Sequence, residues 1–93
     1  MRTLHIEHAI VDFEVWSSAF ERFAQYRREA GVRDHRIHRP VNDPKFVVID
    51  LDFDTTDEAQ RFLIFLQTKV WAVPENAPGL AGRPQTKILE PVA

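Results

Sequence analysis

Apolar and polar residues alternate in two segments of the chain, which is the spacing of a β-strand with one buried face. Residues 3–10 alternate around an apolar face that consists of Leu4, Ile6 and Ile10. His8 interrupts this face. Residues 46–53 alternate strictly, and their apolar face consists of Val47, Ile49, Leu51 and Phe53. The pattern predicts a strand at each segment.

Two shorter strands are predicted from the Gly and Pro residues that flank them rather than from alternation. Residues 33–39 lie between Gly31 and Pro40, which suits a strand at or near a sheet edge. Residues 41–44 read Val-Asn-Asp-Pro, which is typical of a hairpin turn. Residues 85–90 form the last predicted strand, and Pro91 ends it.

Two segments show helical spacing instead. In the first, Asp12 is the expected N-cap, Gly31 is expected to end the helix, and the apolar stripe carries Trp16, Ala19, Phe20, Phe23, Arg27 and Ala30. In the second, Thr55 and Glu58 form a capping-box pattern, followed by a stripe of Ala59, Phe62, Leu63, Leu66 and Val70. Residues 72–84 are rich in Pro and Gly, so we expect an irregular loop, and loops of this length are often lids or entrances to a site.

The order of these elements is β-α-β-β-α-β over a single domain, residues 1–93. This order predicts an α+β ferredoxin-like fold with a four-stranded antiparallel sheet, strand order 4-1-3-2, and both helices on one sheet face. The other face is expected to be bare. A small domain must make such a face polar or pack it on something.

The alternation places titratable side chains on the bare face. His5 and Glu7 share it with Asp50 and Asp52, and Arg36 and His38 join them if Ile37 faces the core. In one interpretation His5 or His38 acts as a general base in a pocket. In the other, the charges pair across a subunit contact or face water. We favour the second, because structural ion-pair networks also gather titratable residues.

Composition narrows the classes of function. The 93 residues carry a net charge of −2, and the 12 basic residues are scattered among 14 acidic ones, so no nucleic-acid footprint is present. Zero cysteines exclude disulfides, thiolate zinc sites and cysteine nucleophiles, and they suit a reducing compartment. No apolar run approaches the length of a secretory or membrane segment. We expect a cytoplasmic chain whose thin core favours a partner subunit, a homodimer.

Aromatic residues make up 11% of the chain, more than its thin core requires. Phe20, Phe23, Phe53 and Phe62 have core spacing, which leaves a surplus of Trp16, Tyr26, Phe65 and Trp71. These rings either anchor a dimer, which we favour, or line a cavity for a flat hydrophobic ligand. His8, on the core-facing side, is expected to be a structural histidine. No local spacing of His and carboxylates predicts a metal site.

Residues 8–16, His-Ala-Ile-Val-Asp-Phe-Glu-Val-Trp, resemble the HxVxD(F/Y)xxW opening of antibiotic-biosynthesis monooxygenase-like proteins in the dimeric α/β barrel superfamily. Further segments resemble the same group across almost the whole chain: 30–32, 36–39, 42–44, 47–49, 52–54, 58–59, 62–63 and 79–84. These motifs specify fold and packing better than activity.

The resemblance implies a homodimer whose sheets face each other, with a cavity between helices and sheet in each subunit. Some members oxidise aromatic phenols with molecular oxygen and no cofactor. Others degrade haem, but their pattern is incomplete here, because the first strand lacks Asn and no His follows Trp71. We therefore expect no cofactor and no metal.

The resulting hypothesis is a cofactor-free oxygenase or cyclase acting on an aromatic small molecule. The candidate catalytic residues are His8, Asp12, His5 and His38. The candidate substrate-binding residues are Trp16, Trp71, Phe65 and Tyr26. The alternative is a noncatalytic ligand-binding or dimeric interaction protein.

Overall fold

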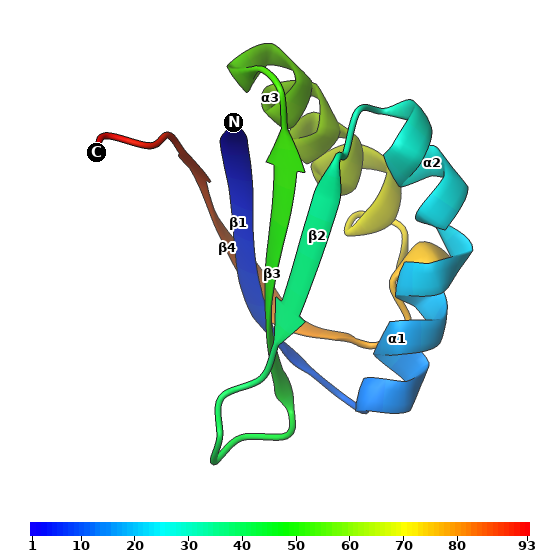
Figure 1. Ribbon diagram of the computed structural model, residues 1–93. Helices are drawn as coiled ribbons and strands as arrows, with labels where there is room; N and C mark the ends of the chain where they lie inside the picture. The colour runs from blue at the N-terminus through cyan, green and yellow to red at the C-terminus, as the bar shows by residue number, and fades with distance from the viewer.

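A computed structural model describes all residues, 1–93. Its antiparallel sheet contains β1 (Arg2–Ile10), β2 (Asp34–His38), β3 (Phe46–Phe53) and β4 (Leu80–Leu89) in the order β2-β3-β1-β4. This confirms the expected strand order. In Figure 1 the connection between β2 and β3 extends beyond the lower end of the sheet, and the last residues lead away from β4.

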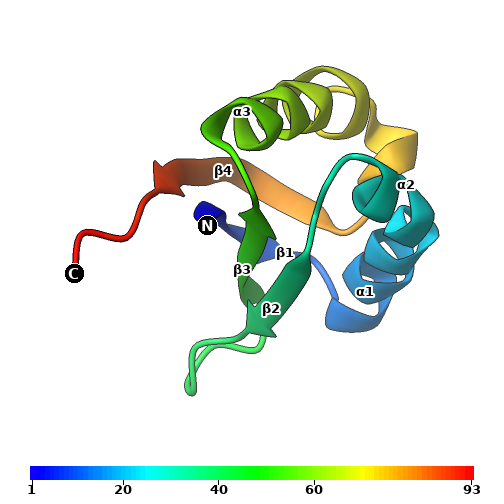
Figure 2. The ribbon, with the colours of Figure 1, turned by 45° about the horizontal axis from the view of Figure 1, so that its top comes forward.

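The helices are α1 (Phe13–Arg22), α2 (Ala24–Glu29) and α3 (Thr56–Phe65), with a π-helical turn η1 (Leu66–Val70) and a short 3-10 turn η2 (Pro74–Asn76). They all lie against one face of the sheet, as Figures 1 and 2 show from two directions. The predicted α+β ferredoxin-like arrangement is therefore confirmed. No helix is both long and apolar enough to span a bilayer.

The core forms where the alternation predicted it. β1 pairs with β3 so that Leu4 lies beside Leu51 and Ile6 beside Ile49, and all four side chains are buried. Phe53 and Phe62 pack together under α3, with ring centroids 5.8 Å apart. The covered sheet face is thus apolar except at His8, and it forms the floor of the space between sheet and helices.

The first helix begins as predicted but is not continuous. The Asp12 carboxylate accepts a hydrogen bond from the Val15 amide, 3.0 Å away, which confirms the N-cap. Gly31 follows α2 with φ +103°, a conformation that favours glycine. Between these ends, Phe23 leaves helical geometry and separates α1 from α2. The apolar stripe continues through this break, so its spacing did not reveal it.

The second helix also begins as predicted, at the Thr55 cap. The Thr55 hydroxyl accepts from the Glu58 amide at 3.2 Å and contacts the Glu58 carboxylate at 3.3 Å.

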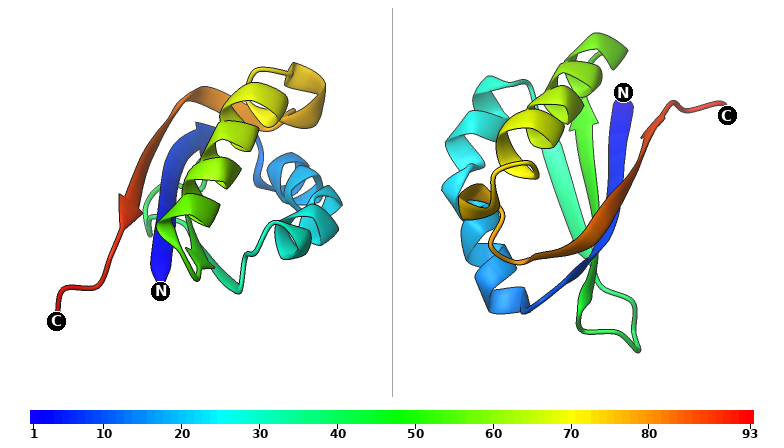
Figure 3. Two further views of the ribbon diagram at one scale, coloured as in Figure 1. Left: turned by 90° about the horizontal axis from the view of Figure 1, so that it is seen from above. Right: turned by 180° about the vertical axis from the view of Figure 1, so that it is seen from behind.

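The prediction of an irregular loop over residues 72–84 is wrong in its second half. β4 begins at Leu80, and the segment before it contains η2. β4 lies at the sheet edge beside β1, as the rear view in Figure 3 shows. Its register shifts between the pairs Ala9–Ala81 and Glu7–Gln85. Pro84 lies in this bulge, where a residue without an N–H costs no ladder hydrogen bond.

Candidate functional site

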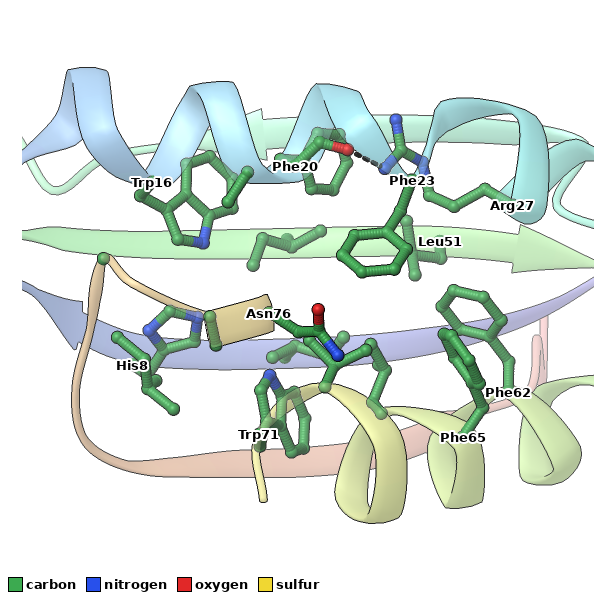
Figure 4. A pocket seen from close by; sticks show the side chains of 18 residues that line it. His8, Trp16, Phe20, Phe23, Arg27, Leu51, Phe62, Phe65, Trp71 and Asn76 are labelled. Atoms are coloured by element: carbon green, nitrogen blue, oxygen red, sulfur yellow. Dashed lines mark hydrogen bonds between the residues drawn. The ribbon is translucent and has the colours of Figure 1, made fainter. Parts of the chain in front are cut away.

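An apolar cavity lies between the covered sheet face and the helices. It is lined by 18 residues, 14 of them hydrophobic, and its volume is about 70 Å³. Figure 4 shows the strands as its floor, α1 along one side and the α3–η1 region along the other. An apolar cavity of about 150 Å³ accommodates benzene. A single aromatic ring therefore requires lining side chains to move, and a fused polycycle requires much more.

Two tryptophans face each other across one end of the cavity. Trp16 extends from α1 and is buried, whereas Trp71 follows η1 and is half-buried. The Trp16 ring stacks on Phe20 with centroids 5.1 Å apart. Neither indole N–H forms a hydrogen bond within the protein. Since no fully buried polar atom lacks a partner, both indole nitrogens keep some exposed surface. Both indole groups are thus donors open to the cavity.

His8 lies at the same end, on the floor of the cavity. Its side chain is 4% exposed, and its ring lies edge-on to Trp16, with centroids 6.4 Å apart. Nδ1 donates to the Ala9 carbonyl at 2.8 Å, which fixes the tautomer and leaves Nε2 as an acceptor with no hydrogen bond. Burial lowers the pKa of His8 below its ordinary 6.5, so the ring is neutral at pH 7.

Arg27 lies toward the opposite end, and sequence reasoning did not single it out. Its side chain is 5% exposed, and its guanidinium lies 3.6 Å above the Phe20 ring centre. One guanidinium nitrogen donates to the Phe20 carbonyl, which also accepts from the Phe23 amide at 3.2 Å where α1 ends. No carboxylate forms an ion pair with Arg27. Burial lowers the pKa of Arg27 from 12.5, although it stays a cation at pH 7.

Asn76 brings a further polar group to the cavity from η2. Its amide nitrogen donates to the Lys69 carbonyl at 2.7 Å, and its oxygen faces the cavity between Trp71 and Phe23 in Figure 4. The chain segment after Asn76 closes this side through Gly79, whose carbonyl accepts from the Val11 amide at 2.9 Å. A few polar groups in an apolar cavity are the usual composition of a small-molecule site.

The predicted site residues separate into three places. His8, Trp16, Trp71 and Phe65 all line the cavity. Tyr26 lies outside it, stacked on Phe65 with ring centroids 4.0 Å apart and 41% exposed. Asp12 caps α1 and does not line the cavity. His5 and His38 lie on the other sheet face, away from these groups.

Ion pairs cover part of that bare face. The His5 ring contacts the Glu7 carboxylate at 3.0 Å and the Asp50 carboxylate at 2.7 Å. Both hydrogen bonds raise the pKa of His5 above 6.5, and the bond to Glu7 has the larger effect. Arg36 pairs with Asp52 at 2.7 Å and thereby lowers the pKa of that carboxyl. The alternation predicted that these titratable groups share one face, whereas the pairs observed here form within one chain. The hollow beside His5 has no hydrophobic lining, so it lacks the character of an aromatic-ligand site.

No group of three or more His, Asp or Glu side chains is arranged to hold a metal ion. The candidate site is therefore the apolar cavity with His8 and the two indoles at one end and Arg27 at the other.

Solved structures share this fold at low sequence identity. A protein from Bordetella bronchiseptica, described provisionally as an antibiotic biosynthesis monooxygenase, has a TM-score of 0.72 at 15% identity, covering 99% of this chain and 98% of its own. Another described as an antibiotic biosynthesis monooxygenase has a TM-score of 0.70 at 11% identity, with both chains covered completely. A dimeric ferredoxin-like protein from an uncultured marine organism has a TM-score of 0.68 at 11% identity, covering 100% of this chain and 96% of its own. No family model and no curated protein matches the sequence.

Proposed function

We propose that the cavity binds a small phenol and that the chain oxidises it with molecular oxygen, without a metal or an organic cofactor. The observation that carries the proposal is the unbonded Nε2 of neutral His8, held in an apolar cavity beside two free indole N–H groups. A base, two donors and a hydrophobic surround are the groups that phenol deprotonation needs.

The first step is proton transfer. Nε2 of His8 accepts the phenolic proton, and the indole N–H groups of Trp16 and Trp71 donate to the resulting phenolate oxygen. Because Nδ1 is held by the Ala9 carbonyl, the acceptor nitrogen keeps its orientation toward the ligand. Apolar walls exclude water, which strengthens these interactions and protects reactive intermediates.

The second step uses the electrons of the ligand itself. For a hydroquinone, the deprotonated ring reduces molecular oxygen, one oxygen atom enters the ring, and the other leaves as water. The products are a hydroxyquinone and water, so atoms and electrons balance without another reductant. The cavity of about 70 Å³ favours a single ring over a fused polycycle, with the half-buried Trp71 as the wall that moves.

The names of two structural neighbours support this reaction class, since both are described as antibiotic biosynthesis monooxygenases. Oxygen uptake with substituted hydroquinones tests it, with isotopically labelled oxygen to trace one atom into the product. His8→Asn is the informative variant, because its amide keeps a donor toward the Ala9 carbonyl and removes Nε2. We expect it to lose at least about 100-fold in rate, the usual effect of a general base.

His38→Asn is the matched control, because His38 is exposed on the other sheet face. It should retain the full rate. Saturable binding without oxygen uptake would refute the oxygenase and favour the noncatalytic ligand-binding protein.

We also propose that two copies assemble through the bare sheet faces. Phe46 and Val48 are half-buried there between the ion pairs, and neighbouring proteins of this fold are described as dimeric. Sedimentation at micromolar concentration should give twice the mass of the 10.8 kDa chain, and a stable monomer would contradict the assembly. Residence in the cytoplasm is proposed on the ground that the chain has no cysteine.

A further inference from the structure

The cavity has two chemically different ends. His8, Trp16 and Trp71 gather at one end in Figure 4, and Arg27 lies at the other beside Phe23 and Leu51. The floor between them runs along β3 and β1, where His8 pairs with Val47. Leu51 lies four residue steps along β3 from Val47, which is about 13 Å at the rise of a β-strand. A ligand that reaches both ends is therefore elongated.

Arg27 is a buried cation with most of its donors unused. A guanidinium offers five N–H groups, and the structure gives only one bond, to the Phe20 carbonyl. Burying an unpaired charge is costly, and the Phe20 ring offsets only part of that cost. Since no fully buried polar atom lacks a partner, the guanidinium nitrogens without a hydrogen bond keep some exposed surface, and the Arg27 side chain lines the cavity.

The surrounding charges do not satisfy Arg27. Glu21 favours its charged form from a distance and Arg28 opposes it, and both of these side chains are exposed. The other side chains that line the cavity include no carboxylate. The anion that matches this guanidinium is thus missing from the protein itself, and a planar carboxylate is the group that a guanidinium fork binds best.

We infer that Arg27 binds a ligand carboxylate, so that the ligand is a single-ring phenol whose acid group lies at the far end of a short chain. This inference rests on the proposed function for the phenolic end only. Hydroxyaryl acids such as 4-hydroxycinnamate have this shape, with the hydroxyl toward His8 and the carboxylate toward Arg27. Arg27 then determines specificity by rejecting neutral analogues, which leave its charge buried and unpaired.

Three probes separate the two ends. They are 4-hydroxycinnamate, its methyl ester, which lacks the acid, and cinnamate, which lacks the hydroxyl. Binding is followed by the NMR signals of the two indole N–H groups, since the chain has only two tryptophans and both line the cavity. We expect wild-type protein to bind 4-hydroxycinnamate at least about tenfold more tightly than the ester, the range of a charge-assisted hydrogen bond.

Arg27→Met should abolish that preference, because it should weaken the binding of 4-hydroxycinnamate while the affinity for the methyl ester stays within about twofold of wild type. Arg27→Lys should keep part of it, because the charge remains and the fork is lost. Equal binding of acid and ester by wild-type protein would overturn the inference, and this comparison needs no variant to fold. If Arg27→Met lowers the affinity for the acid and for the ester equally, Arg27 has a purely structural role, and this result would also overturn the inference.

The same titrations distinguish the two proposals. If cinnamate binds as tightly as 4-hydroxycinnamate and the ester binds more weakly than both, Arg27 binds the acid and the phenol proposal fails. If the ester binds as well as the acid, the phenol proposal survives and the role of Arg27 fails. If neither acid binds, the carboxylate inference is refuted.

Discussion

Gly79, in the segment that follows η2, lies in close contact with the start of α1. A Cβ atom at this position would lie 2.7 Å from both Cα and Cβ of Trp16 and 2.8 Å from its backbone nitrogen. Real Cβ atoms essentially never approach this closely. The obstacle is a helix backbone rather than the end of a flexible side chain. Gly79→Ala therefore forces the segment away from α1.

The cost follows from the overpacking of a site that cannot yield. Inserting a methyl group into a packed interior costs about 1–3 kcal/mol, and a contact with backbone belongs at the upper end. We expect Gly79→Ala to lower the free energy of unfolding by about 3 kcal/mol, out of roughly 5–15 kcal/mol for a domain of this size. Because Gly79 lines the cavity, ligand binding should weaken as well.

Gly82→Ala is the matched control for this change. Gly82 has φ +73°, and a Cβ atom added there would meet no heavy atom within 4 Å, so the variant bears the conformational cost alone, about 1 kcal/mol. Urea unfolding followed by circular dichroism measures both variants. If Gly79→Ala costs no more than Gly82→Ala, the close packing of this segment on α1 is wrong.

Three further predictions concern stability. His8 has a lowered pKa because it is buried, so unfolding should become easier as pH falls below 6.5 toward the folded-state value, and His8→Asn should remove this slope in urea unfolding. The pKa of His5 is raised by Glu7 and Asp50, so its stabilisation is full below pH 6.5 and is lost as pH rises through the raised value; NMR titration of the ring should show a midpoint above 6.5, and one at or below it would be contrary. Phe53→Ala, at a fully buried position, should cost about 3–5 kcal/mol in the same unfolding assay, and a loss below about 1 kcal/mol would contradict the packing.

Most of the fold could be predicted because local patterns and tertiary structure agree. The strand predicted at 46–53 has the same bounds as β3, and the strand predicted at 3–10 differs from β1 by one residue. β4 was predicted to begin five residues late, because Gly82 and Pro84 are typical of loops. An edge-strand bulge admits both residues, and only the pairing with β1 reveals it.

The site was predictable only in part. The surplus of aromatic residues drew attention to Trp16 and Trp71, and the structure places both on the cavity. Arg27 stood within the apolar stripe of the first helix, and a charged residue on a buried face was a usable signal. Asn76 carried no such signal, because its place depends on how η2 folds back toward Lys69.

Entry of an aromatic ligand into the cavity between the two tryptophans underlies both functional proposals. A titration of isotopically labelled wild-type protein with 4-hydroxycinnamate, observed at the two indole N–H signals, tests this entry without any variant. We predict that both signals shift together and saturate, because both groups line the cavity and have no partner in the protein. If both signals stay unchanged up to millimolar 4-hydroxycinnamate, this ligand does not enter between the two tryptophans and the inferred role of the cavity in binding a hydroxyaryl acid is contradicted.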